Sequence, residues 1–206
     1  MGINHNPTRM NTAPVPVNEA RRLKVLWQYE VLDTVPEEVF DDLVELAGAI
    51  CETPIALISL VDESRQWFKA KVGLSANESS RDTSFCAHAI LQPDLFIVPD
   101  ATKDDRFKNN PLVVMDPKIR FYAGAPLVTP DGHALGTLCI LDKVPRELTP
   151  AQAKALRVLA RMAVTQLELR RHSKELAKAR DDTQFLKREL ETTRAHLDNL
   201  ERDKRS

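Results

Sequence analysis

The pattern of apolar positions along the chain begins near Asn18, because the residues before it are polar, interrupted by prolines and without periodicity. Residues 1–17 are therefore predicted to form a disordered N-terminal arm. Asn18 is a good helix cap, and apolar residues follow it at helical spacing. The residues that predict this first helix are Leu23, Leu26, Trp27 and Val31.

A second helix is predicted to begin at Pro36, with Thr34 as its cap. Two glutamates occupy its first turn, where the helix dipole favours acidic side chains. A Thr-Pro pair at 53–54 ends this helix. Its expected buried stripe consists of Val39, Phe40, Leu43, Leu46, Ala47 and Ile50.

The middle of the chain is predicted to be β-structure. Residues 55–61 are apolar on both faces and predict a central strand, and residues 66–72 alternate and predict its antiparallel neighbour. A second hairpin is predicted from 121–128 and 134–141, which flank a strong turn signal. Residues 95–98 predict a further short strand.

The segments between these strands are predicted to be largely irregular. Residues 73–84 are polar and loop-like. Residues 84–91 predict a short helix that ends before Pro93, and residues 100–110 predict a charged loop with a helical turn.

The pattern from Thr149 to the end of the chain is helical. Thr149, Pro150 and Gln152 form a capping box, and no glycine or proline follows. Two rows of mostly apolar residues, each with a spacing of seven, predict a coiled coil, and a single solvated helix is the alternative. The rows are Leu169, Leu176, Thr183, Leu190 and Leu197, and His172, Ala179, Leu186, Thr193 and Leu200.

Composition narrows the classes of partner. The 29 basic and 30 acidic residues nearly cancel, and aromatic residues make up 5% of the chain, so no nucleic acid partner is expected. Three widely spaced cysteines without a CxxC pair argue against a zinc site or a disulfide scaffold and favour a reducing, cytoplasmic location. Because no signal peptide or run of about 18 apolar residues occurs, no direct membrane insertion is expected.

Several stretches, in a fixed order, carry a family resemblance. They lie at 30–34, 40–43, 54–62, 66–69, 84–90 (SFCAHAI), 98–101, 105–107, 110–112, 119–127, 136–142 (GTLCILD) and 145–146. Together they cover about three quarters of the chain and resemble a GAF domain. More narrowly, they resemble the bacterial GAF domains found ahead of histidine kinases and diguanylate cyclases.

This resemblance implies an α+β fold, with a GAF-like antiparallel sheet of about six strands flanked by helices. The heptad spacing adds a long C-terminal coiled-coil helix to this expected fold. It also implies a ligand pocket on one face of the sheet, under the segment 73–122. The expected organisation is the arm at 1–17, a GAF-like sensor domain at 18–168 and a coiled-coil signalling helix at 169–206.

The first candidates for a ligand-binding site are Phe85, Cys86 and His88. His88 would donate a hydrogen bond or act as a ligand, and Cys86 would be a thiol sensor or an attachment point, since a thiol near a helix N-terminus can have a lowered pKa. The alternative is that all three are structural residues of a capped helix. Bilin attachment is not transferred from relatives, because Ala87 separates Cys86 from His88.

A second group of candidates lies in the charged loop and the strand after it. Asp100, Arg106 and Phe107 are the candidates here, since the charged cluster around them suits a charged ligand or a cation. The alternative is an Asp100–Arg106 pair that holds the loop while Phe107 anchors it in the core. Arg120 is a candidate partner for an anion, because its planar fork suits carboxylate or phosphate, and Tyr122 adds a hydroxyl. The alternative for Arg120 is an ion pair with a loop carboxylate such as Asp116.

Three functions follow as hypotheses. The first is a sensory or regulatory module, not an enzyme, that binds an unidentified small molecule or a partner and signals through a parallel homodimer. The second is a scaffold that recruits a separate histidine kinase or diguanylate cyclase. The third is a thiol redox enzyme that uses Cys86 and Cys139, although the local patterns of relatives that reduce free methionine sulfoxide do not match. The sequence identifies no cofactor and no metal ligands.

Overall fold

The computed structural model describes residues 12–203, and their side chains as far as Arg194. Most of the predicted N-terminal arm, residues 1–11, lies outside the described residues, as do the side chains of Leu197 and Leu200. Residues 12–16 have no regular secondary structure. The chain divides into two units that meet between Leu167 and Glu168.

The first unit is built on a six-stranded antiparallel sheet, which confirms the predicted fold class. The strand order is β3-β2-β1-β6-β5-β4. The strands are β1 (Ile55–Val61), β2 (Arg65–Val72), β3 (Glu78–Ser80), β4 (Phe96–Val98), β5 (Phe121–Val128) and β6 (Ala134–Asp142). Both predicted hairpins are present, and β3 was not predicted because its polar residues give no strand signal.

The centre of the sheet is apolar on both faces. All seven residues of β1 are buried, and β1 pairs with β2 on one side and with β6 on the other. Ile58 and Leu60 belong to the core on one face, whereas Leu57 and Val61 belong to the core on the opposite face. Both faces of the sheet must therefore be covered by other elements.

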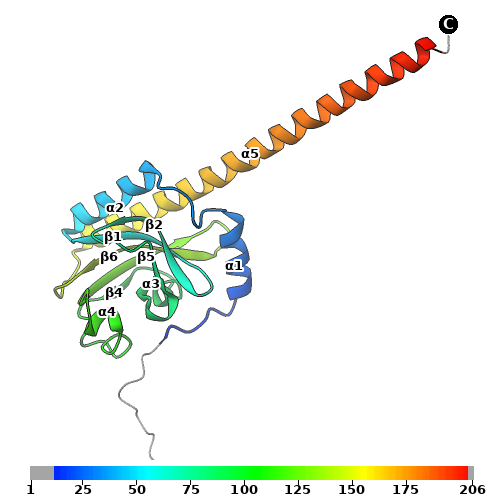
Figure 1. Cartoon of the computed structure of the whole chain (residues 1–206). Coiled ribbons are helices and arrows are strands. Elements are labelled where there is room, and N and C mark those ends of the chain that lie inside the picture. Colours follow the sequence, from blue (N-terminus) through cyan, green and yellow to red (C-terminus); the bar gives the residue numbers. More distant parts are fainter. Residues whose placement is uncertain (1–11, 204–206) are drawn as a thin grey trace, which may run out of the picture. The chain divides into compact units, whose positions relative to one another are not determined.

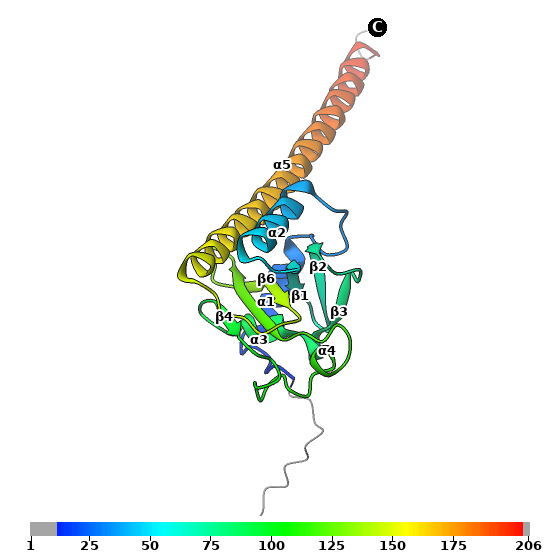
Figure 2. The ribbon, with the colours of Figure 1, turned by 90° about the vertical axis from the view of Figure 1, so that its left-hand side faces the viewer.

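Long helices cover one face. The helix α2 (Glu38–Cys51) and the start of α5 (Pro150–Asp203) lie side by side on it in both ribbon views (Figures 1 and 2). The Gln152 side chain donates a hydrogen bond to the carbonyl of Ile50, and Leu156, Leu159 and Leu167 pack into the same core as α2.

Two short helices cover the other face: α3 (Phe85–Ala89), which follows the 3-10 turn η1 (Arg81–Thr83), and α4 (Pro111–Val114) (Figure 2). The predicted short helix at 84–91 is therefore confirmed as α3, and α4 was not predicted. Asn110 caps α4 by accepting a hydrogen bond from the Leu112 amide. Phe107 is fully buried in this second core, as its anchoring role predicts.

Two predictions about the early helices are wrong in detail. The helix α2 starts at Glu38 rather than Pro36, because Thr34 instead donates to the Val31 carbonyl and accepts from Lys69. The predicted stripe is only half buried, since Val39, Leu46 and Ile50 are exposed.

The first helix, α1 (Glu19–Gln28), is tied to the sheet by a buried cation. Arg22 is 2% exposed and donates to the carbonyls of Val61 and Ala134, at one end of β1 and β6. Glu19 pairs with Arg22 and with Arg81, which follows β3. The prediction placed Val31 in this helix, but the helix ends at Gln28. Trp27, which the apolar pattern also included, is half exposed.

The predicted capping box of α5 is confirmed. The Gln152 amide donates to the Thr149 hydroxyl oxygen, and the Thr149 amide donates to the Gln152 side chain. From Glu168 onward, the described side chains of the second unit include exposed leucines at the predicted heptad positions, namely Leu169, Leu176, Leu186 and Leu190. Among the residues that the structure describes, no helix is long and apolar enough to cross a membrane.

The Glu19 network predicts acid sensitivity. Burial opposes ionisation of Glu19, but hydrogen bonds from Arg22 and Arg81 outweigh it and lower the pKa of its carboxyl from 4.5 to about 2. A lowered pKa in the folded state stabilises the fold above pH 4.5, and this contribution is lost as the pH falls toward 2. We expect Glu19→Gln to reduce the free energy of unfolding near pH 7 by about 1–2 kcal/mol, with allowance for solvent screening, and to flatten its pH dependence in that window.

Urea unfolding between pH 7 and pH 3 measures both effects. Glu63→Gln, on the exposed turn after β1, is the control and should follow the wild-type curve. If the stability of Glu19→Gln depended on pH in the same way as that of the wild type, the acid sensitivity would not come from Glu19.

Candidate functional site

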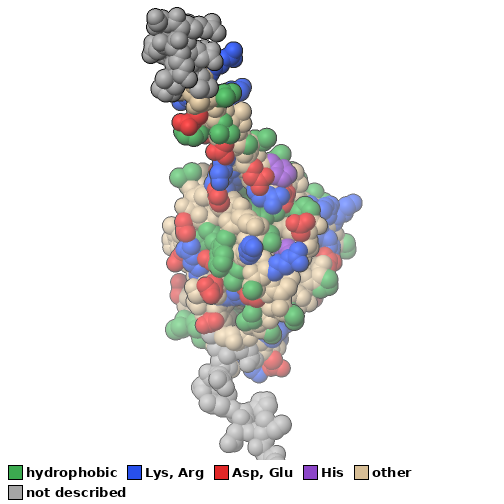
Figure 3. Space-filling view, turned by 90° about the vertical axis from the view of Figure 1, so that its right-hand side faces the viewer, with side chains coloured by type: hydrophobic (Ala, Val, Ile, Leu, Met, Phe, Trp, Pro, Cys, Tyr) green, Lys and Arg blue, Asp and Glu red, His purple; other side chains and the backbone are tan. Residues whose placement is uncertain are grey.

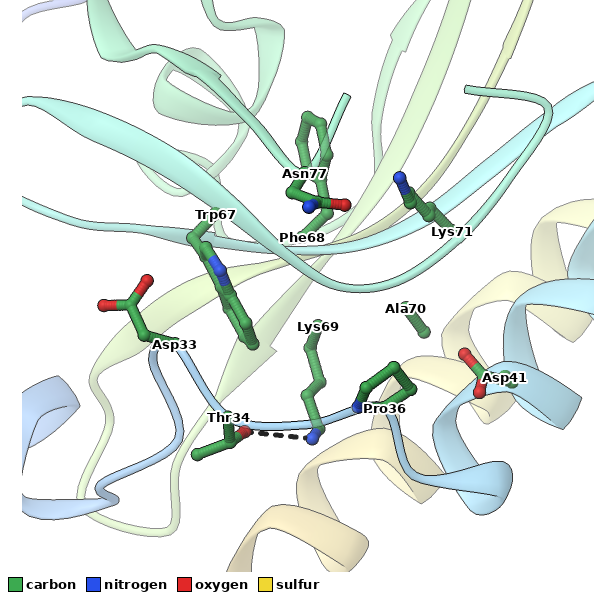
Figure 4. Close-up of a pocket in the computed structure, with 10 residues that line it drawn as sticks. All are labelled: Asp33, Thr34, Pro36, Asp41, Trp67, Phe68, Lys69, Ala70, Lys71 and Asn77. Atoms are coloured by element: carbon green, nitrogen blue, oxygen red, sulfur yellow. Dashed lines mark hydrogen bonds between the residues drawn. The ribbon is translucent and has the colours of Figure 1, made fainter. Parts of the chain in front are cut away.

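One pocket lies between the loop before α2 and the strand β2 and has a volume of about 460 Å³ (Figure 4). Its residues are Asp33, Thr34, Pro36, Asp41, Trp67, Phe68, Lys69, Ala70, Lys71 and Asn77. Figure 4 shows the Lys69 side chain running from β2 to the loop. Lys69 is buried there, and it donates to Thr34 Oγ1 at 3.1 Å, to the Val35 carbonyl at 2.8 Å and to Glu37 Oε1 at 2.6 Å.

These bonds use all three donors of the Lys69 ammonium group. The Lys71 ammonium in turn donates to the carbonyls of Ser75 and Ala76. The cations of this pocket therefore hold the protein's own loops, and we regard the pocket as structural.

A second pocket lies on the opposite face of the sheet, under α3 and α4, and has a volume of about 150 Å³. Its lining is largely apolar, as expected of a site for a small ligand. The lining residues are Leu57, Gln66, Phe68, Leu74, Ala76, Glu78, Ser79, Phe85, Cys86, Leu112, Pro117, Ile119, Tyr122 and Leu141. We refer to this pocket as the α3 pocket.

The α3 pocket contains three of the residues singled out from the sequence: Phe85, Cys86 and Tyr122. Aromatic stacking holds Phe85 and Tyr122 in place, because the centroid of the Phe85 ring lies 4.1 Å from that of Phe107 and 5.2 Å from that of Tyr122. His88 lies behind this stack, with its ring edge-on to Phe107 at 4.8 Å, and it is not a lining residue. Whether these residues bind a ligand stays a prediction.

The start of α3 is fixed by a chain of hydrogen bonds. Ser84 caps the helix by accepting from the Ala87 amide at 3.1 Å, and its hydroxyl donates to the side-chain oxygen of Gln66. The side-chain amide of Gln66 donates to Ser79 Oγ at 2.6 Å. This chain links α3 to β2 and β3, so the pocket wall is attached to the sheet edge.

The charged loop is arranged differently from the prediction. Arg106 pairs with Asp104 rather than with Asp100, and its guanidinium lies over the rings of Phe96 and Phe107 at 4.7 and 5.5 Å. The hydrogen bond from Arg106 lowers the pKa of the Asp104 carboxyl below its ordinary value. Asp100 accepts from Thr102, two residues along the loop. Neither Asp100 nor Arg106 lines the α3 pocket.

Arg120 also lies outside the lining of the α3 pocket. Its guanidinium donates to the carbonyls of Val113 at 2.8 Å and Ile119 at 3.1 Å, and the suggested pair with Asp116 does not form. The side chain therefore joins the end of α4 to the segment that enters β5.

Several lining residues of the α3 pocket were missed. Leu74 and Ala76 come from the loop after β2, and Leu112, Pro117 and Ile119 come from α4 and the loop that follows it. These segments have no period from which an inward-facing side chain can be predicted. Gln66 could have been identified from the sequence, since it is a polar residue at an inward position of an alternating strand.

Two cysteine sulfur atoms lie close together, and one of them, that of Cys86, belongs to a residue that lines the α3 pocket. The Cys86 and Cys139 Sγ atoms are 3.8 Å apart, and the Tyr122 hydroxyl lies 3.5 Å from Cys86 Sγ and 3.4 Å from Thr137 Oγ1. Burial works against an ionised Cys86, but hydrogen bonds from Cys139, Thr137, Tyr122 and Ser59 outweigh it and lower its pKa. Burial and the neighbouring Cys86 raise the pKa of the Cys139 thiol.

The described part of the chain offers no cluster of three or more His, Cys, Asp or Glu side chains that would hold a metal ion. On the face shown in Figure 3, basic and acidic side chains are interspersed among the described residues, without a large patch of one sign. This mixture agrees with the formal net charge of -1.

Comparison with known proteins gives one family and several relatives. The sequence profile of the GAF domain matches residues 35–167. A cyclic di-GMP phosphodiesterase of Pseudomonas aeruginosa is 47% identical over 137 residues, which are 66% of this chain but only 23% of that protein. The chain thus corresponds to about a quarter of the curated relative.

Two bacterial domains are among the solved structures that share the fold. One is a domain of a protein assigned as a two-component sensor histidine kinase in Sinorhizobium meliloti, with a TM-score of 0.55, 19% identity and coverage of 69% of this chain and 97% of that one. The other is the GAF domain of an Acinetobacter phosphoenolpyruvate-protein phosphotransferase, with a TM-score of 0.54, 16% identity and coverage of 74% and 94%.

The α3 pocket should bind small apolar molecules. An apolar cavity of this volume accommodates benzene or xenon, so we expect benzene to shift NMR signals of residues around Phe85 and Leu112 in the wild-type protein. Leu112→Trp should fill the pocket and abolish these shifts. Val114→Trp is the matched control, because Val114 lies on the same short helix but is exposed and outside the pocket. Equal binding by both variants would contradict the pocket assignment.

Proposed function

The chain belongs to the GAF domain family, and from this premise we propose that it is a sensory or regulatory module of signal transduction that binds a small ligand in the α3 pocket and has no catalytic activity of its own. The observation that carries the proposal is the largely apolar cavity of about 150 Å³ beneath α3 and α4. It lies on the face of the sheet where the family resemblance implied a ligand pocket.

The volume and lining of the α3 pocket limit the size and polarity of the ligand. Cavities for drug-sized ligands occupy roughly 300–1,000 Å³, so a volume of about 150 Å³ favours a molecule the size of a single small ring. The polar groups at its wall are few: the Tyr122 hydroxyl, the Cys86 thiol and the side chains of Gln66, Ser79 and Glu78. A compact, mostly apolar molecule with one or two polar atoms fits this lining best.

The proposed output passes through α5. This helix begins in the core of the domain, where Leu156 and Leu159 are buried, and its heptad leucines beyond Glu168 are exposed in the single chain. Leu176, for example, is 71% exposed. Burial of these leucines against a second copy would remove apolar surface from water, which favours association of two chains. We propose that the two chains form a parallel homodimer.

The partners that we propose are signalling enzymes, either a histidine kinase or a diguanylate cyclase. The similarity to part of a cyclic di-GMP phosphodiesterase supports a connection with cyclic dinucleotide signalling. Because the match covers 23% of that protein, its activity is not transferred to this chain. We further propose a cytoplasmic location, which the three free cysteines support.

A scaffold without a ligand is the second candidate function. The exposed heptad leucines favour it as much as they favour the sensor, because recruitment of a partner needs only the helix. The two functions differ in whether the α3 pocket is occupied in the cell.

Native mass spectrometry of the purified protein, before and after denaturation, separates these functions. For the sensor we expect a dimer with a discrete extra mass that is lost on denaturation, and we expect Leu112→Trp to lack that mass. Dimers of the wild type without any added mass, at every expression condition tested, would contradict the sensor and favour the scaffold.

The dimer itself is tested by one pair of variants. Leu176→Glu places a charge in one of the two heptad rows, between the helices of the predicted coiled coil. It should raise the dissociation constant of the dimer at least about 100-fold, because each buried charge lacks a partner. Ala177→Glu adds the same charge one position away, outside both heptad rows, and should associate like the wild type. Sedimentation equilibrium measures the dissociation constants of both variants. A monomeric wild type, or equal constants for the two variants, would refute the predicted coiled-coil contact.

A further inference from the structure

Two of the three cysteines are in van der Waals contact although they are 53 positions apart in the sequence. Cys86 lies in α3 and Cys139 lies in the middle of β6, where it pairs with Leu57 of β1 and Gly124 of β5. Both side chains are buried, and their Sγ atoms are 3.8 Å apart. The third cysteine, Cys51, lies on α2 in the core of the opposite face.

The two thiols are not equivalent. Cys86 lines the α3 pocket and Cys139 does not, so a molecule in the pocket meets Cys86 first. The Tyr122 hydroxyl is 3.5 Å from Cys86 Sγ and can donate to a developing thiolate there. The same hydrogen-bonding surroundings lower the pKa of Cys86, whereas burial raises the pKa of Cys51 to about 11.

Access to Cys86 runs through the pocket. Ala76 and Glu78 are lining residues and are themselves exposed, so the pocket opens to solvent along the segment after β2. A water molecule occupies roughly 30 Å³ of liquid, and a cavity of about 150 Å³ therefore admits a hydroperoxide group. Large oxidants are excluded by the same volume.

We propose that Cys86 and Cys139 are a peroxide-reactive thiol pair, which forms an intramolecular disulfide when hydrogen peroxide or a small organic hydroperoxide enters the α3 pocket. This chemistry goes beyond the proposed ligand binding and does not require that any other ligand be bound.

The reaction has two steps. The Cys86 thiolate attacks one oxygen of the hydroperoxide, an S–O bond forms, the O–O bond breaks, and the departing hydroxide or alkoxide takes the proton that the thiol released. The Cys139 sulfur then attacks the sulfenic acid sulfur of Cys86, the S–S bond forms, the S–O bond breaks, and the leaving hydroxide takes the proton of Cys139. The two thiols lose two electrons, and the hydroperoxide is reduced to water and an alcohol, or to two waters.

Closing the pair requires movement in α3. A disulfide has an S–S distance of about 2.05 Å, and the sulfur atoms start 3.8 Å apart. Because β6 is held on both sides by strands and α3 has five residues, the smaller element is expected to shift. Phe85 would move with it, and its stack on Phe107 and Tyr122 forms part of the pocket wall. Oxidation would therefore reshape the α3 pocket.

The experiment treats the full chain with equimolar hydrogen peroxide, blocks the remaining thiols with an alkylating reagent under denaturing conditions and maps the peptides by mass spectrometry. In the wild type we expect one alkylated cysteine, Cys51, and a linked pair of peptides that contain Cys86 and Cys139. Cys51→Ser is the matched control and should form the same linked pair at the wild-type rate. Cys86→Ser and Cys139→Ser should each lose the disulfide.

Three results would overturn the proposal: no linked peptides in the wild type, a disulfide that includes Cys51, or a sulfinic acid on Cys86 without a disulfide. Circular dichroism of each variant shows whether a lost disulfide comes from unfolding. If Cys86→Ser does not fold, Cys86→Ala replaces it, and the wild-type peptide map decides the question without any variant.

Discussion

The structure depends on one constraint, which is that the central strands are apolar on both faces and both faces must be covered. All seven residues of β1 are buried. Long helices, α2 and the start of α5, cover one face with a continuous core, whereas the short helices α3 and α4 and their loops cover the other. The cavity of about 150 Å³ lies beneath these short elements, on the face that no long helix covers. The position of the candidate site therefore follows from how the sheet is covered.

Buried charge explains why the larger pocket is not the better candidate. Lys69 and Arg22 both place a cation inside the protein, and both are fully engaged with carboxylates and carbonyls of the chain itself. A buried cation is tolerated only with such partners. These two residues join the loop before α2 and the helix α1 to the sheet, so they hold the scaffold. The lining of the α3 pocket contains no lysine or arginine and is mostly apolar.

The helix α3 takes part in both proposed activities of this domain, the binding of a ligand in the α3 pocket and the oxidation of the thiol pair. It supplies Phe85 and Cys86 to the pocket wall, and Cys86 in turn touches Cys139 in the sheet. The helix is short, and its start is held by the Ser84 cap and the hydrogen bond to Gln66. A ligand in the pocket and an oxidised thiol pair would thus act on the same small element. Their effects on the domain are therefore expected to be coupled.

The sequence by itself determined the elements whose signals are local. The hairpin of β5 and β6, the capping box of α5 and the short helix α3 follow from turn residues, caps and periodicity, and the ordered motifs identified the family. Only the tertiary structure decided that Arg106 pairs with Asp104, that Thr34 serves Lys69 instead of capping α2, and that Leu112 lines the pocket. Phe85, Cys86 and Tyr122 were found through the family resemblance, not through a period. Partner choice and pocket lining depend on which distant segments meet, and that is decided by packing across the sheet, which no local pattern records.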